Sequence, residues 1–406
     1  GRVMRKFGVV ALILAISVVF TGCTNNEVKL YNAIMKSQDI TSMQSDTNIS
    51  LNLEGEGFSK EDQQGLQEVA NMLKDSKISI HQKMVQNEEK TSARAQVKTG
   101  LNFAGMDMDM KVWVDTDMSG DTPKMVEIIK MPETLMAQMS PEDSEKAYIV
   151  YNFEDMANSG QEVDFKELMN FSKEMQPKMT NFMKDYHKNF DPGFEIASYK
   201  GKRDIDEKTL SIYEVKLDDA SFKELIRYMV NSSMDNENTI KFIEEYMNAV
   251  MGLVQIPDSE KESAKEEMSQ EIGKLQNNLP ELKKQFNEFM DNFKDVKILG
   301  DKGIVIEYGI NSDGYIVHQS GKIDMNIDLK AIGKAIGNNT LAENSGVVRL
   351  GINYNTKNYN INKDMRINMP SVNKRNAIYY KDILEQEQAG NMTNKGIEEK
   401  PIESNK

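Results

Sequence analysis

Met-Asp-Met-Asp-Met-Lys-Val-Trp-Val-Asp, residues 106–115, is the clearest strand pattern in the chain. Met and Val occupy every second position, and most of the residues between them are charged. Successive side chains of a strand point to opposite faces, so Met106, Met108 and Met110 share one face. The same period of two occurs earlier at 49–53, 78–80 and 93–97. The first part of the chain therefore predicts a sheet with one apolar face.

Strand patterns return in the second half of the chain, where a late meander is expected. A short strand at residues 148–150 still belongs to the first group. The later strand patterns cover residues 194–217, 303–310, 315–329, 346–354 and 366–369. Asn311-Ser312-Asp313-Gly314 separates two of these strands, and its Asp-Gly pair favours a tight hairpin turn.

Helical spacing separates the two groups of strands. Apolar residues three and four positions apart predict helices within 28–37, 61–73, 163–190, 222–251 and 264–293. Pro177 is expected to kink or restart one helix, and Pro280 to divide the last one. The order of helix, strands, helices and strands predicts an α+β fold, with a mostly antiparallel sheet and its helices on one face.

Domain organisation follows from composition. No Pro/Gly/Ser-rich linker interrupts residues 28–370, which favours one large domain, or two fused lobes with a boundary near residue 191. Residues 374–406 are expected to form a C-terminal helix and a disordered charged tail that begins at Asn391. Phe-Lys-Glu-Leu occurs at 165–168 and again at 222–225, which is too short to establish a duplication.

Cys23 is the only cysteine, and it ends a segment typical of an export signal. Met4-Arg5-Lys6 gives a basic start, residues 7–20 are apolar, and Thr21 and Gly22 precede the cysteine. The apolar part is shorter than the roughly 20 residues that a transmembrane helix needs. This arrangement resembles the bacterial lipobox, although Phe20 stands where an aliphatic residue is usual.

The lipobox resemblance implies cleavage after Gly22 and a diacylglyceryl thioether on the Cys23 sulfur. Residues 1–22 would be the signal peptide and 23–26 the lipidated cysteine with a short tether; an uncleaved anchor is the alternative. Acyl chains would hold the protein on the outer, extracytoplasmic face of the cell membrane. Losing the signal changes the formal charge from −14 to −17, because Arg2, Arg5 and Lys6 leave with it. An acidic surface of this kind disfavours nucleic acid as a partner.

The body of the chain resembles a known group, the lipoproteins of Gram-positive bacteria related to LolA and LppX, including clostridial ones. The likeness spans residues 27–373 and rests on pattern and order. It is carried by Leu-Tyr-Asn-Ala-Ile-Met-Lys-Ser at 30–37, Leu-Ser-Ile-Tyr-Glu-Val-Lys-Leu at 210–217, and Asn-Tyr-Asn at 358–360 before Ile-Asn-Met-Pro at 367–370. The resemblance implies an open, strongly curved antiparallel sheet, a half-barrel, with helices on its concave face and room for an acyl chain.

Methionine is unusually frequent, at 28 of 406 residues. A row of thioethers could be plain core, the adaptable wall of an apolar pocket, or a Cu(I) site. The pocket reading predicts that a hydrophobic ligand such as a lipid contacts the inward faces of a strand and two helices. The candidate residues are Met106, Met108, Met110, Val112, Val114, Met247, Val250, Met251, Phe286 and Phe289. Trp113 lies among charged residues on the opposite face of its strand and is expected at a rim.

No motif for catalysis or for a resident cofactor or metal is present, and the chain is expected not to be an enzyme. Residues 115–121 resemble the first half of a calcium loop, but Val126 stands where the bidentate Glu belongs, so a hairpin turn is preferred. His81, His187 and His318 are scattered, without partners at metal or triad spacing.

The sequence thus predicts a membrane-anchored lipoprotein that binds an apolar ligand between a curved sheet and its helices. The alternative is a fully packed structural or sensory module of the cell envelope that acts through contacts with a partner protein. A hydrolase that uses carboxylates alone is a third reading, for which no residue pair is singled out.

Overall fold

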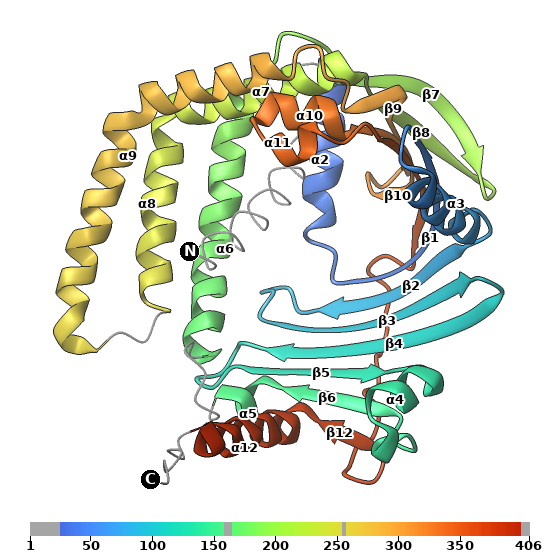
Figure 1. Ribbon diagram of the computed structural model, residues 1–406, viewed down its shortest axis with the longest axis vertical. Helices are drawn as coiled ribbons and strands as arrows, with labels where there is room; N and C mark the ends of the chain where they lie inside the picture. Colours follow the sequence, from blue (N-terminus) through green and yellow to red (C-terminus); the bar gives the residue numbers. More distant parts are fainter. Residues whose placement is uncertain (1–24, 158–164, 254–256, 399–406) are drawn as a thin grey trace, which may run out of the picture.

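The computed structural model describes residues 25–157, 165–253 and 257–398, and its fold is α+β. One open, 12-stranded sheet curves around helix α2 (Asn25–Ser37) in Figure 1. Its strands are antiparallel except where β12 pairs with β6. The predicted curved, mostly antiparallel sheet with helices on its concave side is confirmed. Gly22 and Cys23 lie outside the described residues.

The sheet consists of two meanders that meet at its centre. The order across it is β12-β6-β5-β4-β3-β2-β1-β11-β10-β9-β8-β7. The first meander comprises β1 (Ser42–Glu56), β2 (Lys77–Gln86), β3 (Ser92–Phe103), β4 (Met106–Asp117), β5 (Lys124–Lys130) and β6 (Tyr148–Asn152). The second comprises β7 (Ala197–Ile205), β8 (Lys208–Leu217), β9 (Leu299–Ile310), β10 (Ile316–Asp328) and β11 (Val347–Tyr359), and β12 is Ala377–Tyr379.

β1 and β11 join the two meanders along their length, from the pair Gln44 and Tyr359 to the pair Glu56 and Val347. The position near residue 191 that could separate two lobes lies between the meanders, which share this one sheet.

The remaining helices pack beside and across the sheet. They are α3 (Lys60–Lys74), α4 (Glu133–Met139), α5 (Phe153–Ala157), α6 (Phe165–Lys188), α7 (Asp219–Asp235), α8 (Glu237–Met251), α9 (Asp258–Asn292), α10 (Leu329–Ile336), α11 (Asn339–Ala342) and α12 (Tyr380–Glu398). Figure 1 shows α6, α8 and α9 side by side, forming an arm at one side of the molecule. No helix in the described ranges is both long and apolar enough to cross a bilayer.

The larger core lies where α2 and α7 pack on the β7–β9 end of the sheet. Leu30 of α2, Val215 of β8 and Leu225 of α7 are at most 1 % exposed there. Burying one such side chain contributes roughly 1.5–3 kcal/mol. We call the face of the sheet that carries Val215 the inner face, and the opposite one the outer face.

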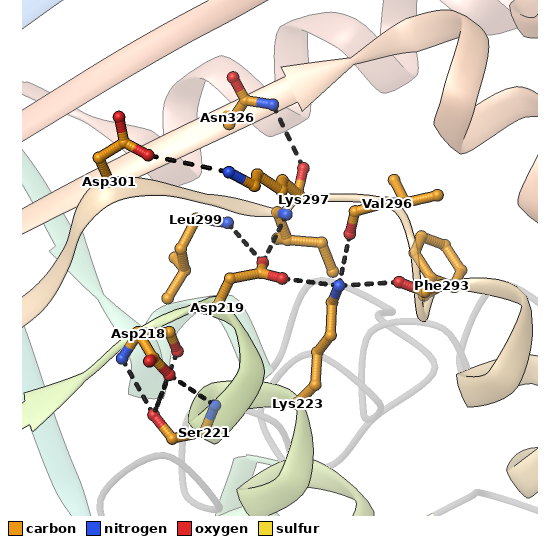
Figure 2. A network of polar contacts seen from close by, with 11 residues as sticks. Asp218, Asp219, Ser221, Lys223, Phe293, Val296, Lys297, Leu299, Asp301 and Asn326 are labelled. Atoms are coloured by element: carbon orange, nitrogen blue, oxygen red, sulfur yellow. Dashed lines mark hydrogen bonds and ion pairs between the residues drawn. The ribbon is translucent and has the colours of Figure 1, made fainter.

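A polar network fixes the start of α7 against the segment that leads into β9 (Figure 2). The Lys223 ammonium lies 2.7 Å from the Asp219 carboxylate and donates to the carbonyl oxygens of Phe293 and Val296. Ser221 and Asp218 form a reciprocal capping box at the helix N-terminus. The buried lysine is therefore both ion-paired and hydrogen-bonded, as burial of a charge requires.

A second, smaller core lies on the outer face of β4–β6 and corrects two predictions. Trp113, expected at a rim, is only 8 % exposed and packs in one cluster with Ile128 and Ile367. Residues 366–369, expected to be a strand, have no strand assignment. They belong instead to the segment between β11 and β12, and Arg94 of β3 donates to the Ile367 carbonyl oxygen at 3.1 Å.

Other local predictions also differ from the structure. α6 continues through Pro177 without the restart that was expected as an alternative to a kink, and α9 continues through Pro280, where a division into two helices was expected. Both prolines are exposed, so water can reach the carbonyl groups that lack an intrahelical donor. β5 was not predicted from the sequence, and α12 extends into the stretch from Asn391 that was expected to be disordered.

Candidate functional site

The candidate site is the middle of the inner face, and strand register defines which residues belong to it. Residues paired directly across antiparallel strands point to the same face. A single line of pairs leads from the buried core to the methionine row: Ile306, Gly321, Tyr354, Ile49, Ile78, Leu101 and Met108. Met108 and, by alternation, Met106, Met110, Val112 and Val114 therefore lie on the inner face.

Apolar side chains cover this middle region, but they are not buried. Over β1–β4 and β11 they are half-exposed: Ile49, Leu51, Leu53, Ile78, Ile80, Val97, Leu101, Met108, Met110, Val112, Val114, Leu350 and Ile352. At the β7–β9 end of the same face, Val215 is fully buried and Ile306 is 8 % exposed. The inner face is thus an apolar surface that the fold fills at one end and leaves accessible in the middle. We call this half-exposed region the apolar floor.

Helices border the apolar floor on three sides. α2 and α7 occupy the β7–β9 end, and at the other end Tyr380 of α12 packs on Tyr151 of β6, with ring centroids 4.8 Å apart. α3 lies over the far end of β1, where a Cβ on Gly55 would overlap the side chain of Leu66. The absence of a side chain at Gly55 leaves room for Leu66 of α3 against the strand.

The ten predicted contact residues fall into two groups that the fold does not bring together. Figure 1 places α8 and α9 in the arm, away from β4. Met247, Val250 and Met251 are half-exposed on α8, whereas Phe289 of α9 is 45 % exposed, with its ring 5.0 Å from Phe293. Phe286 is half-exposed on α9, and Met106, at the start of β4, is 60 % exposed.

Sequence reasoning missed most of the apolar floor. It did not include Ile49, Leu51, Ile78 or Ile80, although these carry the same period-two signal as the methionine row, and it did not include Leu101, which lies beyond the strand pattern at 93–97. Pairing between strands, which links these short segments into one surface, is not visible in the local pattern.

Two cavities lie elsewhere. One of about 960 Å³ lies on the outer face across β1 and β8–β11, and one of about 370 Å³ lies between α6 and α8. None of the ten predicted residues lines either of them. The predicted ligand-binding residues therefore lie outside both of these cavities, and those of β4 lie on the open inner face.

The histidines have separate surroundings. His81 Nδ1 lies 2.5 Å from Asp46, and the His187 ring lies 3.7 Å from that of Tyr31 between centroids. Burial lowers the pKa of His187, and for His318 burial acts first and the charge of Lys357 second in the same direction. Both imidazoles thus favour the neutral form at neutral pH.

The calcium-like stretch forms the turn between β4 and β5, as the hairpin reading predicted. Asp117 accepts hydrogen bonds from the backbone and the hydroxyl of Ser119, and these bonds lower the pKa of its carboxyl group. Within the described ranges, no three His, Cys, Asp or Glu side chains cluster as a metal site would require.

Comparison with known proteins leaves the apolar floor as the main guide to function. No family model matches the chain, and a search of curated proteins finds no match.

Proposed function

We propose that this protein is a non-enzymatic, lipid-anchored extracytoplasmic lipoprotein that binds an apolar ligand, such as a lipid, on the apolar floor. The observation that carries the proposal is the half-exposure of the apolar residues across β1–β4 and β11. A soluble protein seldom leaves a continuous apolar surface accessible unless something binds to it.

The chemistry of the apolar floor suits an acyl chain better than a polar ligand. Its side chains are branched aliphatic groups and thioethers, and methionine adapts to ligands of varied shape. Transfer of acyl methylenes onto such a surface gains roughly 0.8 kcal/mol per buried CH₂ before the costs of association. Several buried methylenes would give useful affinity.

The proposed anchor fits the position of the first helix. Glu27 is 1 % exposed, and its carboxylate accepts hydrogen bonds from the N–H groups of Ile196 and Ala197 beside β7. Four residues from Cys23 to Glu27 reach at most about 14 Å. A lipidated Cys23 would therefore hold the β7 end of the sheet close to the bilayer.

Substitution of Cys23 tests the anchor. Cys23→Ser removes the sulfur that would carry the thioether, so labelled palmitate should not be incorporated, and the protein should be either uncleaved or released. Incorporation at the wild-type level would rule out lipidation at this residue. The control is Ser37→Ala in a chain that keeps Cys23. It should incorporate labelled palmitate at the wild-type level, because the Cys23 thiol is intact.

Native mass spectrometry of the chain purified from its host tests the ligand. Lipid should co-purify with the wild-type protein and be depleted in Leu51→Glu, which places a charge on the apolar floor. Asn52→Glu is the matched control, since Asn52 is the next residue of β1 and lies exposed on the outer face. Equal lipid occupancy in both variants would contradict the proposal.

The second candidate, a module that acts through protein contacts, is favoured by the arm. Leu168, Leu282 and Phe289 on α6 and α9 are 37 %, 38 % and 45 % exposed. If the arm carries the function, Leu282→Glu should abolish partner capture in crosslinking on intact cells while lipid occupancy remains unchanged.

A further inference from the structure

The cavity of about 960 Å³ opens mainly on the other side of the sheet from the apolar floor, and most of the residues that line it are polar or charged, with Ile49 and Val305 among the exceptions. Asn48 and Ser50 of β1 alternate with Ile49 and Leu51, which belong to the apolar floor. Asn353 and Asn355 of β11 alternate in the same way with Ile352 and Tyr354. The two faces of these strands therefore present opposite chemistry to solvent.

Strand register aligns the polar side chains of this cavity in a row. Directly paired residues run across the sheet in the order Ser50, Asn353, Lys322, Val305 and Lys216. Neighbouring strands lie about 4.8 Å apart, so this row extends for about 19 Å. An elongated ligand could contact the five adjacent strands β1, β11, β10, β9 and β8.

The lysines of the cavity have no ion-pair partner among the described residues. Lys77, Lys216, Lys302 and Lys322 are exposed and line the cavity, and their ammonium groups form no ion pair or hydrogen bond within the part of the chain that the structure describes.

The acidic residues of the cavity, by contrast, are already engaged. Glu307 lies 3.0 Å from Arg203, and Asp301 lies 3.8 Å from Lys297. The cavity therefore offers free positive charge on a chain whose formal charge is −14.

The asparagines add a second recognition element. The side-chain amides of Asn48, Asn353 and Asn355 form no hydrogen bond within the described ranges. Each amide can donate to one hydroxyl group and accept from another, as a polyol requires. Ammonium groups suit phosphate as point charges. The asparagines lie on β1 and β11, and Asn353 pairs directly with Lys322 of β10, so amides and ammonium groups are neighbours in the cavity. This combination matches a ligand that carries both hydroxyl groups and phosphates.

We propose that the outer-face cavity binds an extended polyol-phosphate chain, independently of any ligand on the apolar floor. The four lysines would contact phosphate groups, and Asn48, Asn353 and Asn355 would contact hydroxyl groups of the same chain. Because the two sites lie on opposite faces of β1 and β11, a variant of one should leave the other intact.

The test uses the full chain in non-ionic detergent micelles and a fluorescently labelled oligomer of glycerol phosphate, read by anisotropy at low salt. The triple variant Lys77→Glu, Lys216→Glu and Lys322→Glu should bind at least about tenfold more weakly, because each reversed charge removes one phosphate contact. The matched control is Lys184→Glu, Lys241→Glu and Lys284→Glu, which makes the same change of net charge at exposed lysines of α6, α8 and α9. This control should keep most of the affinity.

Three outcomes would overturn the proposal. They are equal loss in both triple variants, equal binding of an uncharged dextran, and equal affinity for the oligomer and for glycerol 3-phosphate alone. The last would mean that the cavity holds a single small anion. Lipid occupancy measured on the same triple variant separates this site from the apolar floor, since it should match the wild type.

Discussion

The carboxylate of Glu27 accepts a hydrogen bond from the backbone N–H of Ile196 at 2.5 Å inside the core. Ile196 immediately precedes β7, the edge strand that has β8 as its neighbour. A carboxylate of the first helix thus supplies an acceptor for a backbone group where the sheet begins. This contact joins the segment next to the proposed anchor to the edge of the sheet.

Removal of this carboxylate should destabilise the fold. Glu27→Ala would leave the N–H groups of Ile196 and Ala197 without this acceptor, and lost hydrogen bonds to a charged group cost about 1.5–3 kcal/mol. Glu27→Gln should lose less, because it keeps an acceptor oxygen. Urea unfolding gives the free energy of each variant. Glu68→Ala, at an exposed position of α3, is the control. If Glu27→Ala lowered the free energy of unfolding no more than Glu68→Ala, the proposed role of Glu27 would be wrong.

The Asp219–Lys223 pair should make stability depend on acid (Figure 2). Burial alone would raise the pKa of Asp219, but the hydrogen bonds from Lys223, Leu299 and Ile298 and the Lys223 charge together lower it. A carboxyl group whose pKa is lower in the folded state contributes stability above the unfolded-state value of about 3.9. That contribution is lost as the pH falls through the folded-state pKa.

Asp219→Asn should therefore lower the free energy of unfolding at neutral pH and flatten its decline in acid. Urea unfolding at a series of pH values from about 7 to about 2 measures both effects. Asp301→Asn is the control, because the Asp301 side chain is 98 % exposed. A wild-type acid profile in Asp219→Asn would show that this carboxyl group is not linked to folding.

The local sequence pattern predicted where strands and turns lie better than it predicted which side chains are buried and which share a surface. Alternation located β4, and the Asp-Gly turn located the β9–β10 hairpin, because both signals lie within a few residues. The burial of Trp113 depends on Ile367, far along the chain, so no local pattern predicts it. The apolar floor likewise needs the pairing of β1 with β11, which brings together residues about 300 positions apart.

Trp113 should report on the docking of the segment that follows β11. It lies in one core cluster with Ile367 and Ala377, and its ring contacts Tyr148 edge-on, with centroids 6.2 Å apart. Truncation after Asn360 removes Ile367 and Ala377, which cover Trp113 on the outer face. The emission of this single tryptophan should therefore shift to the red, and acrylamide should quench it more strongly. Truncation after Tyr379 keeps the segment and should leave the emission unchanged. Identical spectra for the two truncations would contradict the packing of Ile367 on Trp113.

Val112→Trp tests whether the apolar floor has free space above it. Val112 pairs with Val97 and Ile129 on the inner face and is half-exposed. In a filled core the larger ring would overpack the site, at a cost of about 1–3 kcal/mol. On an open floor it should instead occupy the volume that an acyl chain would take.

The expected result is lower lipid occupancy in native mass spectrometry with little change in melting temperature. Lys111→Trp, the preceding residue on the outer face of the same strand, should keep both at the wild-type level. Occupancy and melting temperature separate the two candidate functions. A large fall in melting temperature for Val112→Trp would mean that the space is already filled, which favours the packed module. Wild-type occupancy with a wild-type melting temperature would mean that the ligand, if one binds, lies away from β4.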